Sequence, residues 1–337
     1  MTLRAAHLAP LLLWLVACRT PPAKPLEGPT SWFRGTAELP REETPPGLVL
    51  AFLGDQGLGD DSRAVLELVK AEGAAAVVHL GDFDYKDDPA AWEAQLDAAL
   101  GPQFPYFAVA GNHDERKFLG KGGYQERIAR RLEKLGLPWR GEPGLNCAVR
   151  WRGVLLLCAA PDVLQLDPEE AGAFLTQELA HDDSVWRFCA WHKNQASMQT
   201  GDKKDEAGWW VYEAARRGGA VVATGHEHAY SRTHLLSSCE RQEVAATASP
   251  LLLAKDDPAT PADEGRTFVV VSGLGGQSVR EQKRGGPWWA TVWTKDKGGQ
   301  PGALFAQLGH QGDEKLARFY FKDVSGKLVD EFLVRAP

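Results

Sequence analysis

The chain has 337 residues, of which 44% are hydrophobic and 25% are charged. These fractions are those of an ordinary globular protein, and the length allows one large domain or two modest ones. The formal net charge is −7, and no run of lysine and arginine forms a basic stripe. Because binding to a nucleic-acid backbone needs clustered cations, we expect no nucleic-acid partner.

The N-terminus carries a short apolar segment. The run Leu8–Val16 ends in Ala17-Cys18, is too short to span a bilayer, and has the flanks of a secretory signal. The tetrad Leu15-Val16-Ala17-Cys18 resembles the lipobox of bacterial lipoproteins, which implies a lipid on Cys18. The alternatives are a plain secretory signal cut nearby and an uncleaved anchor.

This interpretation divides the chain into three segments. Residues 1–17 are predicted to be a lipoprotein signal peptide, residues 18–47 a proline-rich tether, and residues 48–337 a single folded domain. The resemblance to lipoproteins implies an exported protein that is anchored through Cys18 to a bacterial membrane, in the periplasm or at the cell surface. It leaves the membrane and the oligomeric state open.

An exported protein folds in an oxidising compartment, so the remaining cysteines could pair. Cys147 and Cys158 lie on two apolar runs separated by Arg152-Gly153. A two-residue turn there would place them opposite each other at a hydrogen-bonded pair, where Cβ atoms are further apart. This spacing favours buried free thiols and leaves a disulfide open.

The first half of the domain alternates short apolar runs with segments of helical spacing. Such runs are typical of buried strands in an α/β sheet. The predicted strands are Leu48–Leu53, Ala75–Leu80 and Tyr106–Ala110, and the predicted helices are Ser62–Ala71, Pro89–Leu100 and Gln125–Leu135.

The second half continues the pattern and adds a C-terminal hairpin. The predicted strands are Leu145–Trp151, Val154–Ala159, Val185–Trp191, Ala220–Thr224, Thr267–Ser272, Ala303–Gln307, Arg318–Val324 and Leu328–Val334, with helices at Glu169–Ala180 and Trp209–Arg217. Two stretches between them, Ser237–Arg266 and Glu281–Gly302, are predicted to be irregular. Long irregular stretches are usually functional or mobile.

Polar residues that could bind metal ions follow the predicted strands. These residues are Asp55, Asp82, Asn112, His192, His226 and His228. In open α/β sheets, sites gather beyond the carboxyl ends of the strands. Mixed oxygen and imidazole donors suit Zn, Fe or Mn, and two metals about 3.5–4 Å apart form a clamp for phosphoryl displacement. The pattern therefore indicates a two-metal phosphate-ester site.

Five short blocks in a fixed order resemble those of the calcineurin-like metallophosphoesterases. They are Gly54-Asp55-Gln56-Gly57, Gly81-Asp82-Phe83-Asp84-Tyr85, Gly111-Asn112-His113-Asp114, Cys189-Ala190-Trp191-His192 and Gly225-His226-Glu227-His228. The first block lacks the histidine that is usual two residues after its aspartate. The second block resembles the GDxxY pattern of purple acid phosphatases. The fourth block has Cys189 where valine is usual.

The resemblance implies a fold, a ligand set and a chemistry. The implied fold is a four-layer α/β/β/α metallophosphoesterase sandwich. Carried over position by position, Asp55, Tyr85 and His228 hold the first metal, Asn112, His192 and His226 hold the second, Asp82 bridges them, and His113 binds phosphate or protonates the leaving group. The Tyr85 site would hold Fe(III), and the other site Fe(II), Zn or Mn.

The expected function is hydrolysis of a small-molecule or surface phosphate ester, as a phosphomonoesterase similar to acid phosphatases. In that reaction Asn112 and His113 stabilise the growing negative charge. The alternatives are a phosphodiesterase of the same superfamily and a non-catalytic surface binding lipoprotein. His79, inside a strand, is predicted to be a core residue. Trp288, Trp289 and Trp293 either line the mouth of the site or anchor their own loop.

Overall fold

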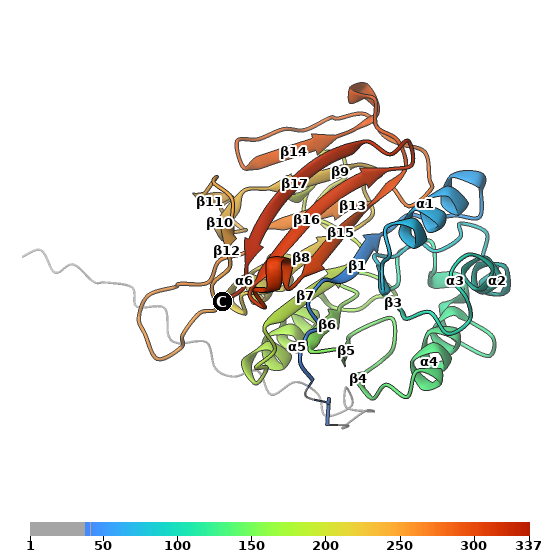
Figure 1. Ribbon diagram of the computed structural model, residues 1–337, viewed down its shortest axis with the longest axis horizontal. Coiled ribbons are helices and arrows are strands. Elements are labelled where there is room, and N and C mark those ends of the chain that lie inside the picture. Colours follow the sequence, from blue (N-terminus) through green and yellow to red (C-terminus); the bar gives the residue numbers. More distant parts are fainter. Residues whose placement is uncertain (1–37, 41) are drawn as a thin grey trace, which may run out of the picture.

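Two β-sheets stacked face to face form the centre of the molecule in the computed structural model, which describes residues 38–40 and 42–337 (Figure 1). The predicted signal peptide, Cys18 and residues 19–37 and 41 of the predicted tether lie outside the described residues. Among the residues described, no helix is both long enough and apolar enough to cross a bilayer.

The first sheet joins the N-terminal strands to the C-terminal hairpin. In order across the sheet its seven strands are β12 (Leu251–Leu252), β17 (Leu328–Arg335), β16 (Leu316–Asp323), β15 (Gly302–Leu308), β1 (Leu48–Leu53), β2 (Ala76–His79) and β3 (Tyr106–Ala108). Strands β1, β2 and β3 are parallel, and β15 is antiparallel to β1. The parallel part therefore directs its carboxyl ends to one edge.

The second sheet has eight strands and a parallel centre. Its order is β14 (Trp289–Trp293), β9 (Tyr230–Thr233), β13 (Val269–Ser272), β8 (Val221–Thr224), β7 (Trp186–Trp191), β6 (Val154–Cys158), β5 (Cys147–Trp151) and β4 (Trp139–Gly141). Strands β6, β7, β8 and β13 are parallel to one another, whereas β5 and β9 run antiparallel at either side of them. A separate small ribbon pairs β10 (Leu235–Ser238) with β11 (Glu243–Ala246).

Helices cover the outer faces of the two sheets. The first sheet carries α1 (Asp60–Ala71), α2 (Pro89–Ala99), the short α3 (Glu115–Phe118) and α4 (Tyr124–Lys134), and the second carries α5 (Pro168–Ala180) and α6 (Trp209–Arg217). Figure 1 shows α1–α4 gathered at one side of the molecule, away from α5 and α6. The fold is thus the expected four-layer α/β/β/α arrangement.

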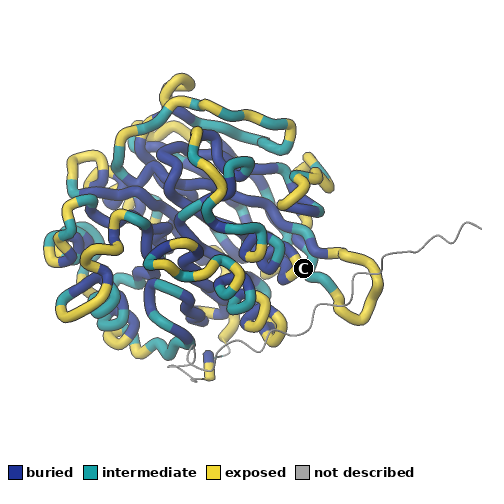
Figure 2. The backbone as a smooth tube through the Cα atoms, turned by 180° about the vertical axis from the view of Figure 1, so that it is seen from behind, coloured by how far each residue is buried: buried dark blue, intermediate teal, exposed yellow. Residues whose placement is uncertain are grey.

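The alternation of side chains along the strands divides the core into two parts. Along β6, Leu156 belongs to the large cluster between the sheets, whereas Leu155 and Leu157 belong to the cluster under α5 and α6. Successive side chains of a strand point to opposite faces, so a strand between two packed layers is apolar throughout. Figure 2 shows buried segments running through the centre of the molecule and exposed segments at its periphery.

The prediction of two irregular stretches is wrong in part. Residues 237–266 contain β11 and β12, and residues 281–302 contain β14. The structure also adds β4 and β9, which the sequence analysis did not predict. These strands are two to five residues long, too short for the apolar periodicity that reveals longer strands.

The prediction of buried free thiols is confirmed. Cys147 and Cys158 are register partners on β5 and β6, and both are free and buried. Arg152 and Gly153, at φ values of 47° and 74°, form the two-residue turn between the strands. Positive φ at both central residues is the geometry that matches the twist of a two-residue hairpin.

A buried polar network ties the two sheets together. Asp330 on β17 accepts hydrogen bonds from Tyr230 (2.8 Å) and from Nε of Arg232 (2.7 Å), both on β9. The side chains of Arg232 and Asp330 are only 9% and 7% exposed. The network crosses from one sheet to the other at the side of the sandwich that lies away from α2 and α4.

Candidate metal centre

The carboxyl ends of strands from both sheets meet at one edge of the sandwich. Asp55 follows β1 and Asp82 follows β2 in the first sheet, while His192 follows β7 and His226 follows β8 in the second. The loops contact each other directly, because the backbone N–H of Asp55 donates to the carbonyl of Gly81 at 2.9 Å. The strand-end side chains therefore face a common space, as expected for parallel strands.

Asp55, Tyr85 and His228 form the first cluster of donor atoms. The Tyr85 hydroxyl lies 3.0 Å from Oδ1 of Asp55 and 3.1 Å from Nε2 of His228. Nε2 of His228 lies 3.3 Å from the same Asp55 oxygen. These are the residues that the resemblance assigns to the first metal, and the structure brings all of them together.

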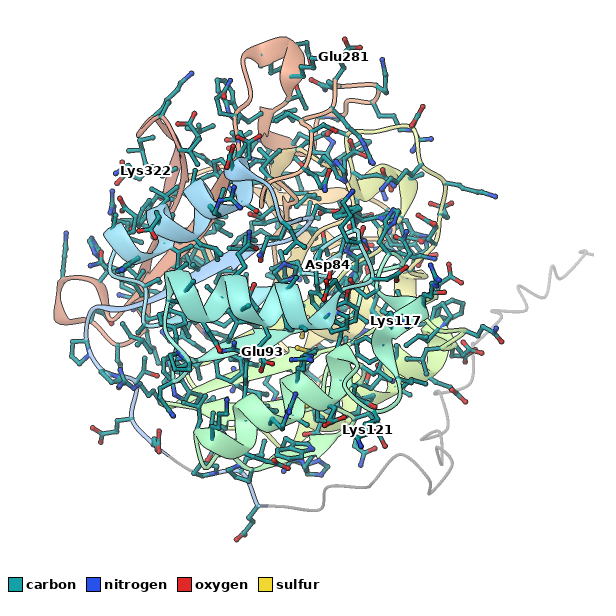
Figure 3. The ribbon with its side chains drawn as sticks, turned by 90° about the vertical axis from the view of Figure 1, so that its right-hand side faces the viewer. Asp84, Glu93, Lys117, Lys121, Glu281 and Lys322 are labelled. Atoms are coloured by element: carbon teal, nitrogen blue, oxygen red, sulfur yellow. The ribbon has the colours of Figure 1, made fainter. Side chains whose placement is uncertain are left out.

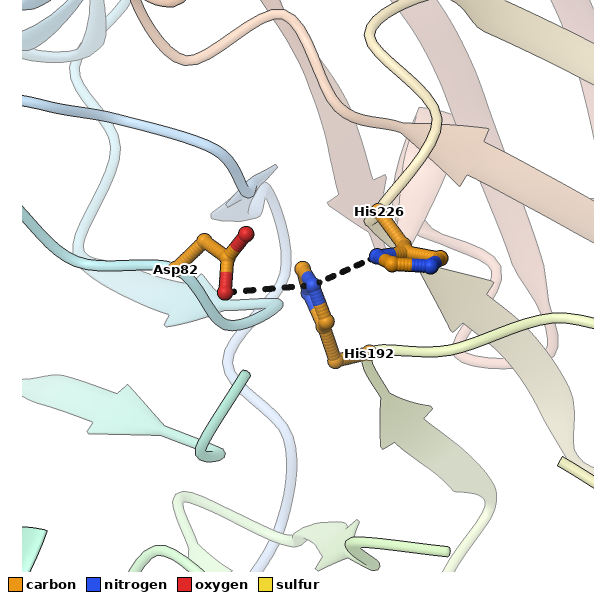
Figure 4. Close-up of side chains that lie close together, drawn as sticks. All are labelled: Asp82, His192 and His226. Atoms are coloured by element: carbon orange, nitrogen blue, oxygen red, sulfur yellow. Dashed lines mark hydrogen bonds and ion pairs between the residues drawn. The ribbon is translucent and has the colours of Figure 1, made fainter. Parts of the chain in front are cut away.

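Asp82, His192 and His226 form the second cluster (Figure 4). Nε2 of His192 lies 3.3 Å from Oδ1 of Asp82 and 3.1 Å from Nδ1 of His226. One ligand atom from each of the three residues falls within 4.8 Å of the others, which suits a shared metal ion. All three residues are buried.

Asn112 and His113 extend from the loop beside Asp82. The backbone N–H of His113 donates to Oδ1 of Asp82 at 2.9 Å. Oδ1 of Asn112 is buried and has no hydrogen-bond partner among the described residues. A buried amide oxygen without a donor is costly unless a cation approaches it. The imidazole of His113 is exposed, and its ring centre lies 4.6 Å from that of Tyr85.

Outer contacts fix the orientation of each histidine. Nδ1 of His192 donates to the carbonyl of Leu80 (2.7 Å), and Nδ1 of His228 donates to the carbonyl of Ser278 (3.0 Å). Nε2 of His226 contacts a carboxylate oxygen of Glu206 at 2.9 Å. Metal-binding histidines usually use their second nitrogen in this way, which leaves the other nitrogen free for the ion.

The residues present fit a pair of transition-metal ions. The two clusters combine carboxylate, imidazole, phenol and amide donors, the set that suits Fe, Zn or Mn. The unpartnered oxygen of Asn112 and the histidine nitrogens that face one another are explained if cations lie between them. Asp82 adjoins both clusters, because it contacts His192 and its charge also raises the pKa of the Tyr85 phenol.

The charges in the centre shift the pKa values of its residues strongly. Burial raises the pKa of the Tyr85 phenol, and the carboxylates of Asp55 and Asp82 raise it further. Burial lowers the pKa of His192, but Asp82 and Asp55 outweigh burial and raise it to about 9. Burial lowers the pKa of His226 to about 4 in spite of the Glu206 contact. Without a nearby cation, therefore, Tyr85 stays a neutral phenol.

The backbone of the centre adopts left-handed conformations at four residues with side chains. The φ values are 57° at Asp55, 60° at Asp82, 57° at Tyr85 and 71° at His226. Aspartate and histidine tolerate this region better than most residues, whereas a bulky tyrosine is a true outlier. Such conformations cluster at functional sites, where the surrounding structure holds them in place.

Two glycines allow the loops to approach so closely. A Cβ at Gly111 would lie 2.2 Å from Oδ1 of Asp82 and 2.4 Å from its backbone nitrogen. A Cβ at Gly81, where φ is 90°, would lie 2.6 Å from Nδ1 of His192. Any other residue at these positions would displace a candidate ligand.

The sequence analysis missed several residues that shape the centre. The buried carboxylate of Asp114 accepts backbone hydrogen bonds from Asp82 (2.9 Å), Phe83 (2.8 Å) and Gly111 (2.7 Å), which ties two ligand loops together. Its place in the third block was a usable signal. Glu206 and Arg280 lie in loops that match no motif, so nothing in the sequence pointed to them.

Other predicted residues have structural roles. His79 is fully buried, accepts a hydrogen bond from the Gly81 backbone at 3.2 Å and stacks on Tyr106, so the prediction of a core residue is confirmed. Trp288 donates to the carbonyl of Ser197 at 2.9 Å and so anchors its own loop.

Comparison with known proteins agrees with this geometry. The sequence model of the calcineurin-like phosphoesterases matches residues 49–230, more than half of the chain. No curated protein matches the sequence.

Several solved structures share the fold. The purple acid phosphatase PPD1 from yellow lupin (Lupinus luteus) seeds has a TM-score of 0.60 at 15% identity, with 86% of this chain and 55% of the lupin chain covered. This chain thus spans about half of the lupin protein. GAP50, the anchor in the inner membrane complex of Plasmodium, has a TM-score of 0.51 at 12% identity, covering 86% and 89%. PhoD has a TM-score of 0.50 at 13% identity, covering 86% and 73%.

At these identities the structural likeness shows the fold alone, and the family follows from the sequence match. That match covers the loops that carry Asp55, Asp82, Asn112, His192 and His226. The chain belongs to the calcineurin-like phosphoesterase family.

Proposed function

We propose that the chain is a dinuclear phosphomonoesterase similar to the purple acid phosphatases. The observation that carries this proposal is the position of Tyr85, whose hydroxyl lies 3.0 Å from Asp55 and 3.1 Å from His228. The first block has no histidine after Asp55, so the first metal needs another donor, and the phenol of Tyr85 is within reach. A phenolate is a hard anionic ligand that suits Fe(III).

Each cluster of donor atoms would hold one of the two metals. Asp55, Tyr85 and His228 would hold Fe(III), Asn112, His192 and His226 would hold Fe(II), Zn or Mn, and Asp82 would bridge them. Such a pair of ions supplies Lewis acidity for displacement at phosphorus. Asp55, Asp82 and a deprotonated Tyr85 would provide negative charge to balance the ions. Burial excludes bulk water from these side chains, which strengthens every electrostatic contact there.

The chain's own residues then bind the ester and move a proton. The amide of Asn112 and the imidazole of His113 lie on one loop, fixed to Asp82 by the hydrogen bond from His113 N–H. His113 is the exposed member of the site and the best candidate to protonate the departing alkoxide at its oxygen. Asp114 positions this loop through its three backbone hydrogen bonds.

The proposed location is outside the cytoplasm on a lipid anchor at Cys18. This part of the proposal rests on the tetrad Leu15-Val16-Ala17-Cys18 and on the proline-rich segment after it. The substrate would then be a phosphate ester in the periplasm or at the cell surface.

The test combines metal analysis with assays on matched esters. Protein with two metals per chain should hydrolyse phenyl phosphate faster than diphenyl phosphate. His113→Ala should keep both metals and lose roughly 10²–10⁴ in rate on an alkyl phosphate, the usual contribution of a positioned proton donor. The loss should be smaller for 4-nitrophenyl phosphate, because its leaving group needs little protonation.

His310→Ala is the matched control, since His310 follows β15, whose last residue pairs with Leu48 at the end of β1 opposite to Asp55. It should retain wild-type rates on every ester. Equal losses across leaving groups in His113→Ala would assign His113 to phosphate binding. Faster cleavage of the diester would make the protein a phosphodiesterase, and a metal-loaded protein inactive on every ester would overturn the function.

A further inference from the structure

A cavity of about 240 Å³ adjoins the metal centre. Its lining includes Gly201, Glu227, Val279, Arg280, Lys283 and Lys295. Two of these residues connect it to the centre. Glu227 stands between His226 and His228 in the chain, and Nη2 of Arg280 lies 3.4 Å from Nε2 of His228. A substrate group that extends from the metals would therefore meet Arg280.

Two cations converge between the cavity and the metals. Nη1 of Arg280 donates to the carbonyl of His226 at 3.3 Å, and the ammonium of Lys203 donates to the same oxygen. Oε2 of Glu227 lies 3.5 Å from Nη1 of Arg280. Asp55 and Asp82 also attract Lys203, but both are candidate metal ligands, so bound metals would offset their charge and leave Glu227 facing two cations.

The other carboxylates around the cavity do not neutralise the positive charge of Arg280 and Lys203. Glu281 pairs with Lys283 at 2.9 Å, and the side chains of both are about half exposed. Asp202 is exposed. In Figure 3, Glu281 lies at the outer edge of the molecule, well away from Asp84 in the second ligand block. The positive charge beside the metal centre therefore comes from Arg280, which lines the cavity, and from Lys203, which meets Arg280 at the carbonyl of His226.

The cavity wall around Arg280 is held in place by contacts between two loops. The N–H of Lys283 donates to the carbonyl of Thr200 (2.8 Å), and Arg284 donates through Nη2 to the carbonyl of Asp202 (3.0 Å). The N–H of Lys295 donates to the carbonyl of Arg280 at 2.8 Å. Supporting contacts of this kind hold binding side chains in position before the ligand arrives.

We propose that this cavity binds a second anionic group of the substrate, a carboxylate or another phosphate on the alcohol part of the ester. The proposal rests on the phosphatase function proposed above. The guanidinium of Arg280 offers a planar fork for an oxyanion, and the ammonium of Lys203 adds a point charge. The substrate class is therefore a phosphomonoester with a second negative group, in place of a neutral alkyl or aryl ester.

The experiment compares esters that differ only in the second group. The probes are propyl phosphate, 3-(phosphonooxy)propanoate and propane-1,3-diyl bisphosphate, assayed with protein carrying two metals per chain. The measured quantity is the ratio of kcat/KM for each charged ester to that for propyl phosphate. We expect a ratio above one in the wild type, and the larger of the two ratios identifies the preferred anion as carboxylate or phosphate.

The variants test which side chains recognise that group. Arg280→Ala and Lys203→Met should each lower the ratio roughly tenfold to a hundredfold, as expected for lost charge-assisted hydrogen bonds. Arg280→Lys should recover part of the ratio, because it keeps the charge without the fork. Arg241→Ala is the control, since Arg241 is 67% exposed and pairs with Glu243 away from the centre. Its ratio should equal that of the wild type.

Each other outcome overturns the proposal in a distinct way. A wild-type ratio of one, with all three esters hydrolysed, removes the second-anion site and leaves the phosphatase function intact. Equal losses on all esters in Arg280→Ala assign the arginine to the scissile phosphate. Loss of metal from Arg280→Ala, with an unchanged ratio after reloading, makes it a positioning residue for His228. Hydrolysis of none of the esters would overturn the phosphatase function itself.

Discussion

Tyr85 is the most unusual residue of the centre. It combines a φ of 57° with a hydroxyl placed between Asp55 and His228. Burial and the two nearby carboxylates raise the pKa of its phenol, so the side chain is neutral in the metal-free protein. A trivalent cation would lower the pKa of the phenol again, because it favours the phenolate by direct attraction. In the proposed site, Tyr85 would thus be a ligand whose ionisation depends on the metal.

Replacing Tyr85 tests this assignment by colour. Charge transfer from a phenolate to Fe(III) absorbs visible light, so oxidised protein loaded with iron should be violet to pink. Tyr85→Phe should lose the visible band and keep its fold, because the ring and its packing survive. The measurement is the absorption spectrum of both proteins, oxidised, with iron confirmed by analysis.

Tyr106→Phe provides the matched control. The Tyr106 hydroxyl donates to Gln56 at 2.9 Å and lies outside the ligand clusters, so the band should persist in this variant. Wild-type protein that contains Fe(III) but has no visible band would show that Tyr85 is not a ligand. The preference for monoesters would then lose its support.

His192 gives the centre a defined pH dependence. Although burial lowers its pKa, Asp82 and Asp55 raise it to about 9, so the metal-free protein carries a proton on His192 below that pH. A metal binds the neutral imidazole and must displace this proton. Affinity should therefore rise with pH, by up to about tenfold per unit, and level off near pH 9. His226, with a pKa of about 4, is already neutral in this range.

The measurement is Zn²⁺ affinity by chelator competition at several pH values between 6 and 9. It is best made in Tyr85→Phe, where no phenol proton can contribute to the slope. Calorimetry in two buffers of different ionisation enthalpy should show release of about one proton per chain at pH 7. An affinity that does not change with pH would show that His192 is neutral before the metal binds.

The candidate ligands were predictable from the sequence because each follows a recognisable strand. Asp55, Asp82, His192 and His226 stand one to three residues beyond an apolar run, and the topology brings these ends together. Glu206 and Arg280 were not predictable. They reach the centre from loops whose path is set by tertiary contacts, such as the hydrogen bond from Lys283 to Thr200.

The strands and helices separate into a predictable core and less predictable edges. Strands such as β1 and β6 are buried on both faces and appear in the sequence as continuous apolar runs. The strands β14 and β11 are partly or largely exposed and only five and four residues long, so neither shows a distinct apolar pattern. β12 is only two residues long. Pairing with a neighbour, more than side-chain burial, makes these segments strands.

The buried ion pair between Arg232 on β9 and Asp330 on β17 should contribute strongly to the free energy of unfolding. Asp330 is paired with Arg232 at 2.7 Å, and both side chains are almost fully buried. Asp330→Ala would leave a buried guanidinium without its carboxylate partner, which typically costs about 3–5 kcal/mol. The measurement is the free energy of unfolding from denaturant titration, with metal content held constant.

Glu331→Ala is the matched control on the same strand. Glu331 pairs with Arg318, but their side chains are 47% and 29% exposed, so the pair should contribute less than about 1 kcal/mol. Similar losses of unfolding free energy in Asp330→Ala and Glu331→Ala would contradict a special role for the buried ion pair. Replacing both Arg232 and Asp330 with apolar residues should restore part of the stability.

At the scale of the whole molecule, the lipid anchor would determine where the enzyme acts. Cys18→Ser should release the protein from the membrane fraction or block its processing, because the proposed lipid would be attached to the thiol. Fractionation and the mass of the mature chain are the measurements. Thr20→Ala leaves the tetrad intact and should stay in the membrane fraction. Unchanged processing and membrane association in Cys18→Ser would remove the lipoprotein interpretation.

The left-handed backbone at the metal centre determines which substitutions there would stabilise this chain. Glycine would relieve the strain at Asp55, Asp82, Tyr85 and His226, at about 1–3 kcal/mol for each strained residue. A scaffold kept only for its shape would gain stability by accepting glycine there. Proteins move toward such stabilising changes unless function opposes them. Continued selection for catalysis would keep a side chain at all four positions. The side chains at these positions therefore argue against a non-catalytic surface binding protein.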